Sequence, residues 1–139
     1  MPAEHPPPLV LALVLADNGH VDPTSNKCFV LGTIGVLRFA SFPAQLRKLC
    51  IYAALTEGRG KTDLTIRLVD ADEPGEPIFS RNVEVGFETP LAVVELMYVR
   101  ADLEIPEPGE YRLQLCAAGN PLCERRLIVA EIAGENRGP

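Results

Sequence analysis

The sequence predicts an all-β fold, an antiparallel β-sandwich of about eight strands with an immunoglobulin-like or related Greek-key topology. Apolar segments recur at short and similar intervals, and clusters of Gly, Pro, Asn and Asp separate them. No long helical stretch lies between the apolar segments, whereas βαβ units need a helix between successive strands. The 13 prolines and 11 glycines therefore act as turn residues rather than as a low-complexity tract.

The first three apolar segments occupy residues 9–16, 28–39 and 49–56. The first is a continuous apolar run, which is typical of a strand buried on both faces. It is followed by Asp17, Asn18 and Gly19, a tripeptide that favours a turn because Asn and Gly tolerate positive φ, and the predicted turn region continues through residues 22–27. Residues 44–48, just before the third segment, are compatible with one helical turn.

The remaining five segments complete the predicted sandwich at residues 64–69, 78–87, 91–105, 111–115 and 122–132. Leu64, Ile66 and Leu68 alternate with polar residues, which is the period-two pattern of a strand with one wet face. The acidic stretch 70–77 and the Pro-Gly stretch 106–109 are predicted turns.

One domain is expected, because 139 residues fall within the usual size of a single domain. Hydrophobic residues make up 47% and charged residues 23%, which indicates a packed core rather than disorder. We expect the domain to occupy residues 9–132, between a Pro-rich arm at residues 1–8 and a frayed polar tail at residues 133–139.

Two resemblances support the predicted fold. Residues 108–115 resemble the penultimate strand of many immunoglobulin-like domains, in which a Pro-Gly turn precedes a tyrosine that caps the preceding corner. Tyr111 would take that role, with its hydroxyl bonded to the backbone. The Cys and Trp core of antibody domains is absent, since the chain contains no Trp.

The chain as a whole resembles an uncharacterised family of small bacterial proteins. The matching stretches are residues 15–22, 29–33, 52–62 and 106–115. This resemblance implies a fold and no activity.

Charge and cysteine usage predict a cytoplasmic protein that binds neither nucleic acid nor membrane. The net charge is −6 and Lys and Arg are scattered, whereas nucleic-acid binders concentrate them on one face. Residues 1–8 contain no Lys or Arg, which disfavours a signal peptide. The four cysteines lack the close pairs of zinc sites. Cys116 and Cys123 could face each other across a hairpin, although reduced thiols are expected in the cytosol.

No catalytic, metal or cofactor constellation stands out, so an enzyme is not expected. His20 lies near Asp17 and Asp22, but no nucleophile motif accompanies it. The alternative is a ligand-binding module in which acidic turns meet in space and hold calcium or a small polar ligand. Its candidate residues are Asp17, His20, Asp22, Asp70 and Asp72.

The most informative feature for function is the segment 91–99, which is apolar on both faces. A strand of a sandwich normally has one wet face, so this segment is either covered by the N-terminal arm or placed in an interface. The candidate interface residues are Val93, Met97, Val99 and Tyr98. We therefore expect a non-enzymatic interaction or structural module that binds a protein partner or forms a homodimer.

Overall fold

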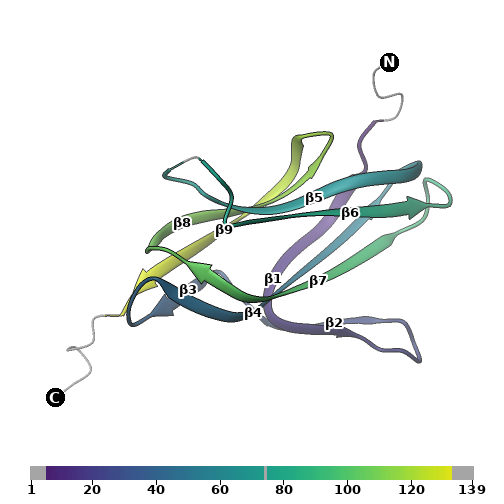
Figure 1. The fold of residues 1–139 in the computed structure, drawn as a ribbon. Helices are drawn as coiled ribbons and strands as arrows, with labels where there is room; N and C mark the ends of the chain where they lie inside the picture. Colours follow the sequence, from purple (N-terminus) through teal and green to yellow (C-terminus); the bar gives the residue numbers. More distant parts are fainter. Residues whose placement is uncertain (1–5, 74, 133–139) are drawn as a thin grey trace.

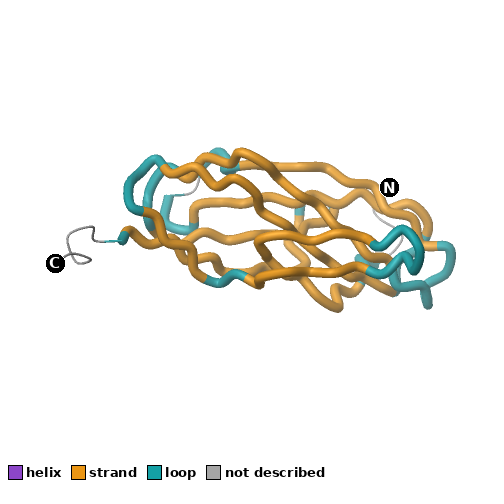
Figure 2. Tube along the Cα trace, turned by 90° about the horizontal axis from the view of Figure 1, so that it is seen from below, coloured by secondary structure: helices purple, strands orange, loops and turns teal. Residues whose placement is uncertain are grey.

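The computed structural model describes residues 6–73 and 75–132 and contains nine β-strands in two sheets (Figures 1 and 2). The predicted all-β class is confirmed. In the described residues no helix has the length and hydropathy that crossing a bilayer requires. The expectations for residues 1–5 of the arm and for the tail 133–139 lie outside the described residues.

The first sheet has four strands in the order β2-β1-β4-β7. Their bounds are β1 Leu9–Val21, β2 Cys28–Thr33, β4 Ala44–Thr56 and β7 Val94–Ile105. The second sheet has five strands in the order β3-β9-β8-β5-β6. Their bounds are β3 Val36–Phe39, β5 Gly60–Asp70, β6 Phe79–Phe87, β8 Gly109–Ala117 and β9 Asn120–Glu131.

Neighbouring strands are antiparallel, except that β3 runs parallel to β9. The parallel pair arises because the chain changes sheets after β2. The stretch 28–39, predicted as one strand, therefore divides at Ile34 and Gly35 into β2 and β3, which belong to different sheets. This division raises the strand count from the predicted eight to nine.

Two local predictions are wrong. Residues 44–48 form the start of β4 rather than a helical turn, because Ala44 and Leu46 pair with residues of β7. The turn expected at residues 17–19 is also absent, since β1 continues through Val21. The later part of the predicted turn region, residues 22–27, is confirmed: Asp22 N–H donates to Lys27 O and Asn26 adopts a positive φ of 61°.

The hydrophobic core draws on both sheets through alternate strand positions. Each buried leucine or isoleucine stabilises the fold by about 1.5–3 kcal/mol. The predicted inward face of β5 is confirmed. Among the fully buried side chains are Leu13, Leu49, Ile51, Leu55, Leu64, Ile66, Leu68, Leu113, Leu115 and Leu127.

Tyr111 anchors the turn that enters β8. Its side chain is fully buried, and its hydroxyl donates a hydrogen bond of 2.6 Å to the backbone carbonyl of Glu107. Burial, as the largest cause, raises the pKa of this phenol. Gly109 lies between the two residues with a φ of 148°, where a side chain would strain the backbone. The corner role predicted for Tyr111 is therefore confirmed.

We predict that Tyr111→Phe lowers the free energy of unfolding by about 1 kcal/mol, because the Glu107 carbonyl loses its donor. Urea denaturation measures the effect. Tyr98→Phe is the matched control, since the hydroxyl of Tyr98 takes part only in a 3.5 Å contact from Arg100. Equal stability losses in the two variants would contradict the corner bond.

Candidate functional site

The outer face of the first sheet is partly covered by the sheet itself. After residue 16, β1 leaves β4 and pairs with β2, and this hairpin curls back over β4 and β7. A Cβ atom added to Gly19 would lie 2.7 Å from Cys50 Sγ and 2.8 Å from Met97 Sδ. The backbone of the hairpin therefore rests directly on these two sulfur atoms, and only glycine permits that approach.

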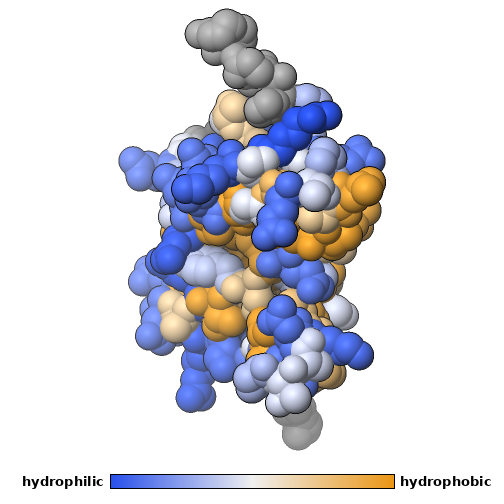
Figure 3. Space-filling model, turned by 90° about the vertical axis from the view of Figure 1, so that its right-hand side faces the viewer, coloured by the Kyte–Doolittle hydropathy of each residue, from blue (hydrophilic) through white to orange (hydrophobic). Residues whose placement is uncertain are grey.

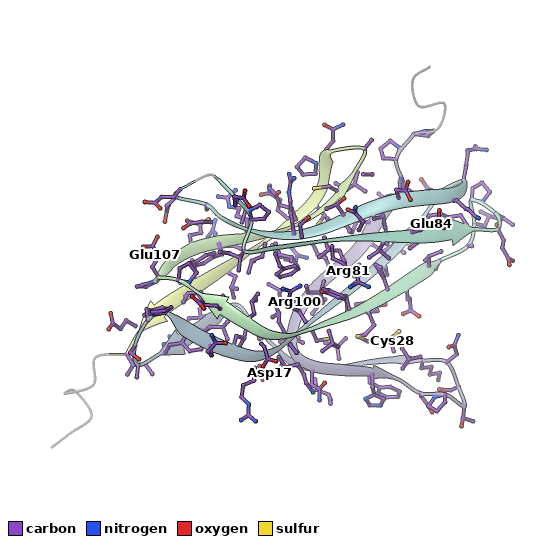
Figure 4. All side chains as sticks on the ribbon, viewed as in Figure 1. Asp17, Cys28, Arg81, Glu84, Arg100 and Glu107 are labelled. Carbon is purple, nitrogen blue, oxygen red and sulfur yellow. The ribbon has the colours of Figure 1, made fainter. Side chains whose placement is uncertain are left out.

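Cys50 of β4 and Met97 of β7 lie beneath the hairpin at Gly19. Cys28 of β2 is two residues from Val30, the partner of Gly19, so it faces the same side of the hairpin (Figure 4 labels Cys28). We call these three side chains the sulfur cluster. The Cys50 thiol donates to Met97 Sδ at 3.2 Å, and Cys50 is fully buried. Alternation explains the placement, because Leu49 and Ile51 enter the core and Cys50 between them must face outward.

Tyr52 and Glu95 extend the sulfur cluster. The register places Tyr52 opposite Met97, and the phenol of Tyr52 donates to Glu95 Oε2 at 2.5 Å. Burial, this hydrogen bond and the charge of Glu95 raise the pKa of Tyr52 to about 12.

The two thiols of the cluster are held in their protonated forms. Burial and then the negative charge of Glu95 raise the pKa of Cys28. Burial and then the charge of Cys28 raise the pKa of Cys50, an effect that Lys48 partly offsets. Burial of the thiols and the charge of Glu95 therefore both disfavour the thiolate forms at this place.

The predicted interface residues separate into two groups. Val93 and Val99 are 58% and 40% exposed, so they lie on the surface. Met97 instead contacts Cys50, and Tyr98 packs against the core with its ring 6.1 Å from Phe79.

The cover over Met97 comes from the backbone around Gly19, not from the described part of the N-terminal arm. Pro6, Pro7 and Pro8 lie elsewhere, in a groove of about 460 Å³ beside Arg59 and Lys61.

The edges of β6 and β7 are joined by cation–π contacts. The guanidinium of Arg81 lies 5.3 Å from the ring centre of Tyr98. The guanidinium of Arg100 lies 5.3 Å from the ring centre of Phe79 (Figure 4 labels both arginines). Each contact pairs a strand of one sheet with a strand of the other. This explains why Tyr98 is not free for a partner.

The predicted ligand residues do not come together. Asp22 caps its own turn, where it accepts bonds from Thr24 N–H and Ser25 Oγ, and His20 stacks on Phe29 with ring centres 5.1 Å apart. Asp17 and Glu107 lie apart in Figure 4, and the carboxylate of Asp70 is close to that of Glu107. The acidic turns of the two sheets therefore form no common calcium site.

A different acidic group forms at the turn after β5. Carboxylate oxygens of Asp70, Glu73 and Glu107 lie within 4.8 Å of one another. Asp72 does not join them: its N–H donates to Asp70 Oδ1. The group supplies three carboxylates, whereas calcium takes about six to eight oxygen ligands. Sequence inspection missed Glu107 because it comes from a separate turn.

Cys116 and Cys123 do not face each other. Cys123 pairs with Leu115 on the core side of the second sheet, while Cys116, the next residue after Leu115, faces the other side. All four cysteines are free thiols. The hairpin bridge considered from the sequence is therefore not formed.

The sequence analysis missed the sulfur cluster, although part of its signal is visible. Cys50 and Tyr52 are two residues apart, as are Glu95 and Met97, so each pair must share one face of its strand. What the sequence does not reveal is the curl of β1 and β2, which adds Cys28 to the cluster.

These features define a small all-β domain with one polar, solvated sheet and one sheet whose outer face carries a buried thiol, a half-buried thiol and exposed apolar groups. A family model described as a family of unknown function, DUF6941, matches residues 11–130, and the chain belongs to this family. The match includes the whole sulfur cluster and nearly all of the nine strands. A search of curated proteins gives no match.

We predict that Glu95→Gln lowers the pKa of Tyr52 from about 12 toward its ordinary value, because the carboxylate that holds the phenol proton is lost. The raised pKa stabilises the fold below pH about 10, and this contribution disappears as the pH rises through about 12. Phenolate absorbance, compared with that of Tyr52→Phe, measures the shift. An unchanged titration in Glu95→Gln would contradict the assignment.

We also predict that Gly19→Ala lowers the free energy of unfolding by about 1–3 kcal/mol, because its methyl group overlaps two sulfur atoms. Gly86→Ala in β6 is the control, since a Cβ there meets no atom within 4 Å. Chemical denaturation of both variants gives the comparison. Equal stability of the two variants would show that the hairpin does not press on the sulfur cluster.

Proposed function

We propose that the chain is a non-enzymatic interaction module that forms a homodimer through the edge of β2. The carrying observation is the apolar exposure of this edge strand: Phe29 and Leu31 are 43% and 51% exposed. They are two residues apart, so they share one face of β2. Val93, just before β7, and Val99 on β7 add exposed apolar groups at the other edge of the same sheet.

β2 is the least protected of the four edge strands. Edge strands usually carry charges or prolines that prevent pairing with another chain. β3, β6 and β7 each contain charged residues, among them Arg38, Arg81 and Arg100, whereas β2 contains neither charge nor proline. Figure 3 shows apolar surface among charged groups on the face of the molecule that it draws.

A second copy fits this edge because two β2 strands can pair antiparallel about a two-fold axis. Each then satisfies the unpaired backbone groups of the other, and the four-stranded sheet becomes continuous across the dimer. The uncharged strand also keeps the repulsion between two chains of net charge −6 away from the contact.

The finer description of the fold is part of this proposal. We infer an immunoglobulin-like sandwich, in which β4 and β7 correspond to strands B and E, and β5, β8 and β9 to strands C, F and G. The neighbour relations β4-β7, β5-β8 and β8-β9 support this correspondence. The tyrosine at the start of β8, bonded to the backbone four residues upstream, supports it further.

We also propose a reducing, cytoplasmic location, supported by the four free thiols. The bacterial origin implied by the sequence resemblance stays a prediction.

We predict that light scattering after size exclusion gives a dimer for the native chain and a monomer for Leu31→Lys, since a buried charge on each β2 opposes pairing. Val36→Lys is the matched control, because Val36 is 43% exposed but lies on β3 of the other sheet. Met97→Asp is unsuitable, because Met97 packs on Cys50. A monomeric native chain would refute the proposal, as would dimer loss in Val93→Lys with a persistent dimer in Leu31→Lys.

A further inference from the structure

We propose that Arg67, on the outer face of the second sheet, anchors a small organic carboxylate in the groove beside it. The groove has a volume of about 440 Å³, within the range of about 300–1,000 Å³ that is typical of small-ligand sites. Its lining from the sheet consists of Arg67 and Val69 of β5, Arg112 and Gln114 of β8, and Glu124 of β9. The edge of β2 belongs to the other sheet, so this inference goes beyond the proposed dimer.

A row of hydrogen bonds across three strands fixes the position of Arg67. The register places Arg67 opposite Gln114, and Gln114 opposite Glu124. Arg67 Nε donates to Gln114 Oε1 at 2.7 Å, and Gln114 Nε2 donates to Glu124 Oε2 at 2.8 Å. Because each side chain is held by the next, the guanidinium is in place before a ligand binds, which lowers the ordering cost of binding.

The two arginines of the groove differ in their charge partners. Arg112 forms ion pairs with Glu110 at 3.0 Å and with Glu124 at 3.1 Å. Glu124 therefore has both oxygens engaged, one by Arg112 and one by Gln114. Among the described residues Arg67 forms no ion pair. The positive charge of Arg67 thus remains for an added anion.

The donors that Arg67 keeps match a carboxylate. Its Nε is engaged by Gln114, whereas its two terminal Nη groups make no hydrogen bond to a described residue. Two parallel N–H groups at the end of a guanidinium fit the two oxygens of a carboxylate. One cation without a counterion matches one negative charge, and the nearby acids Asp70 and Glu124 oppose the second charge of a phosphate.

Apolar groups complete the groove and indicate the rest of the ligand. Val69 lines it from β5, and Ala71 and Pro77 line it from the turn that follows. An apolar group packed against them leaves water, and it also shields the contact between the carboxylate and Arg67 from water. The ligand class is therefore a monocarboxylate with a small apolar body.

The test is a titration of the full-length chain with benzoate, followed by nuclear magnetic resonance at constant ionic strength. We expect saturable shifts of the Arg67 Nε–H and Gln114 side-chain amide signals, with a Kd of about 1 mM. Benzamide has nearly the same shape without the charge, so we expect it to leave both signals in place. Absence of shifts at ten times the expected Kd would overturn the proposal, as would equal binding of benzamide.

Variants separate a positioned guanidinium from charge alone. Arg67→Gln should weaken benzoate binding by at least about tenfold, and Arg67→Lys by about fivefold, because lysine keeps the charge but loses the fork. Arg47→Gln is the matched control, since it removes the same charge from an exposed position on β4 of the other sheet. Thermal melts establish that each variant is folded.

Equal losses in Arg47→Gln and Arg67→Gln would show a general charge effect and overturn the site. A peptide with a free C-terminal carboxylate is the second probe, compared with its C-terminal amide. Binding of the free-acid peptide without binding of benzoate would assign the groove to chain ends and overturn the small ligand. We expect benzoate to bind and to compete with the peptide.

Discussion

The burial of β4 on both faces is the constraint on which the rest of the structure depends. Leu49, Ile51 and Leu55 fill the core on one face, while Cys50 and Ala54 are buried on the other. The second burial is possible because the residues of β1 that approach Cys50 are small: Ala16 pairs with Cys50, and Gly19 lies against its sulfur atom. Small side chains let the sheet curl until the β1–β2 hairpin meets β4, and the curl in turn creates the sulfur cluster.

The two sheets use their outer faces differently. On the second sheet, Arg112 bonds to Glu110 and Glu124, and Arg67 bonds to Gln114, which gives a polar and solvent-accessible network. Exposed ion pairs of this kind contribute little stability, about 0–1 kcal/mol each. The first sheet instead places thiols, an uncharged edge and exposed valines outward. Its outer face therefore carries the features that the fold itself does not require.

Sequence reasoning succeeded where the determining interactions are local. The alternation of β5 follows from period-two patterning, and the role of Tyr111 follows from a turn only four residues long. It failed where contacts join distant residues. The Asn18-Gly19 pair tolerates a turn but does not require one, and Asn18 instead accepts a bond from the N–H of Gly19 within the continuing strand.

The sulfur cluster could be predicted only in part, because its residues are brought together by contacts between distant parts of the sequence. Periodicity places Cys50 and Met97 outward on their strands, but it cannot say what covers them. The cover is decided by the contact of Gly19 with two sulfur atoms that lie far away in the sequence. The division of residues 28–39 into β2 and β3 is also determined by distant residues, since it depends on the pairing of β3 with β9 near the other end of the chain.

The two faces of β2 carry different chemistry. Alternation along β2 sends Cys28 and Val30 toward the inner side of the hairpin and Phe29 and Leu31 toward solvent. Among the described strands β2 pairs with β1 alone, so the contact of Gly19 with Cys50 and Met97 fixes the position of the whole hairpin from its inner side. The outer edge that the proposed dimer uses is therefore held in place before a second copy binds, which lowers the ordering cost of strand pairing.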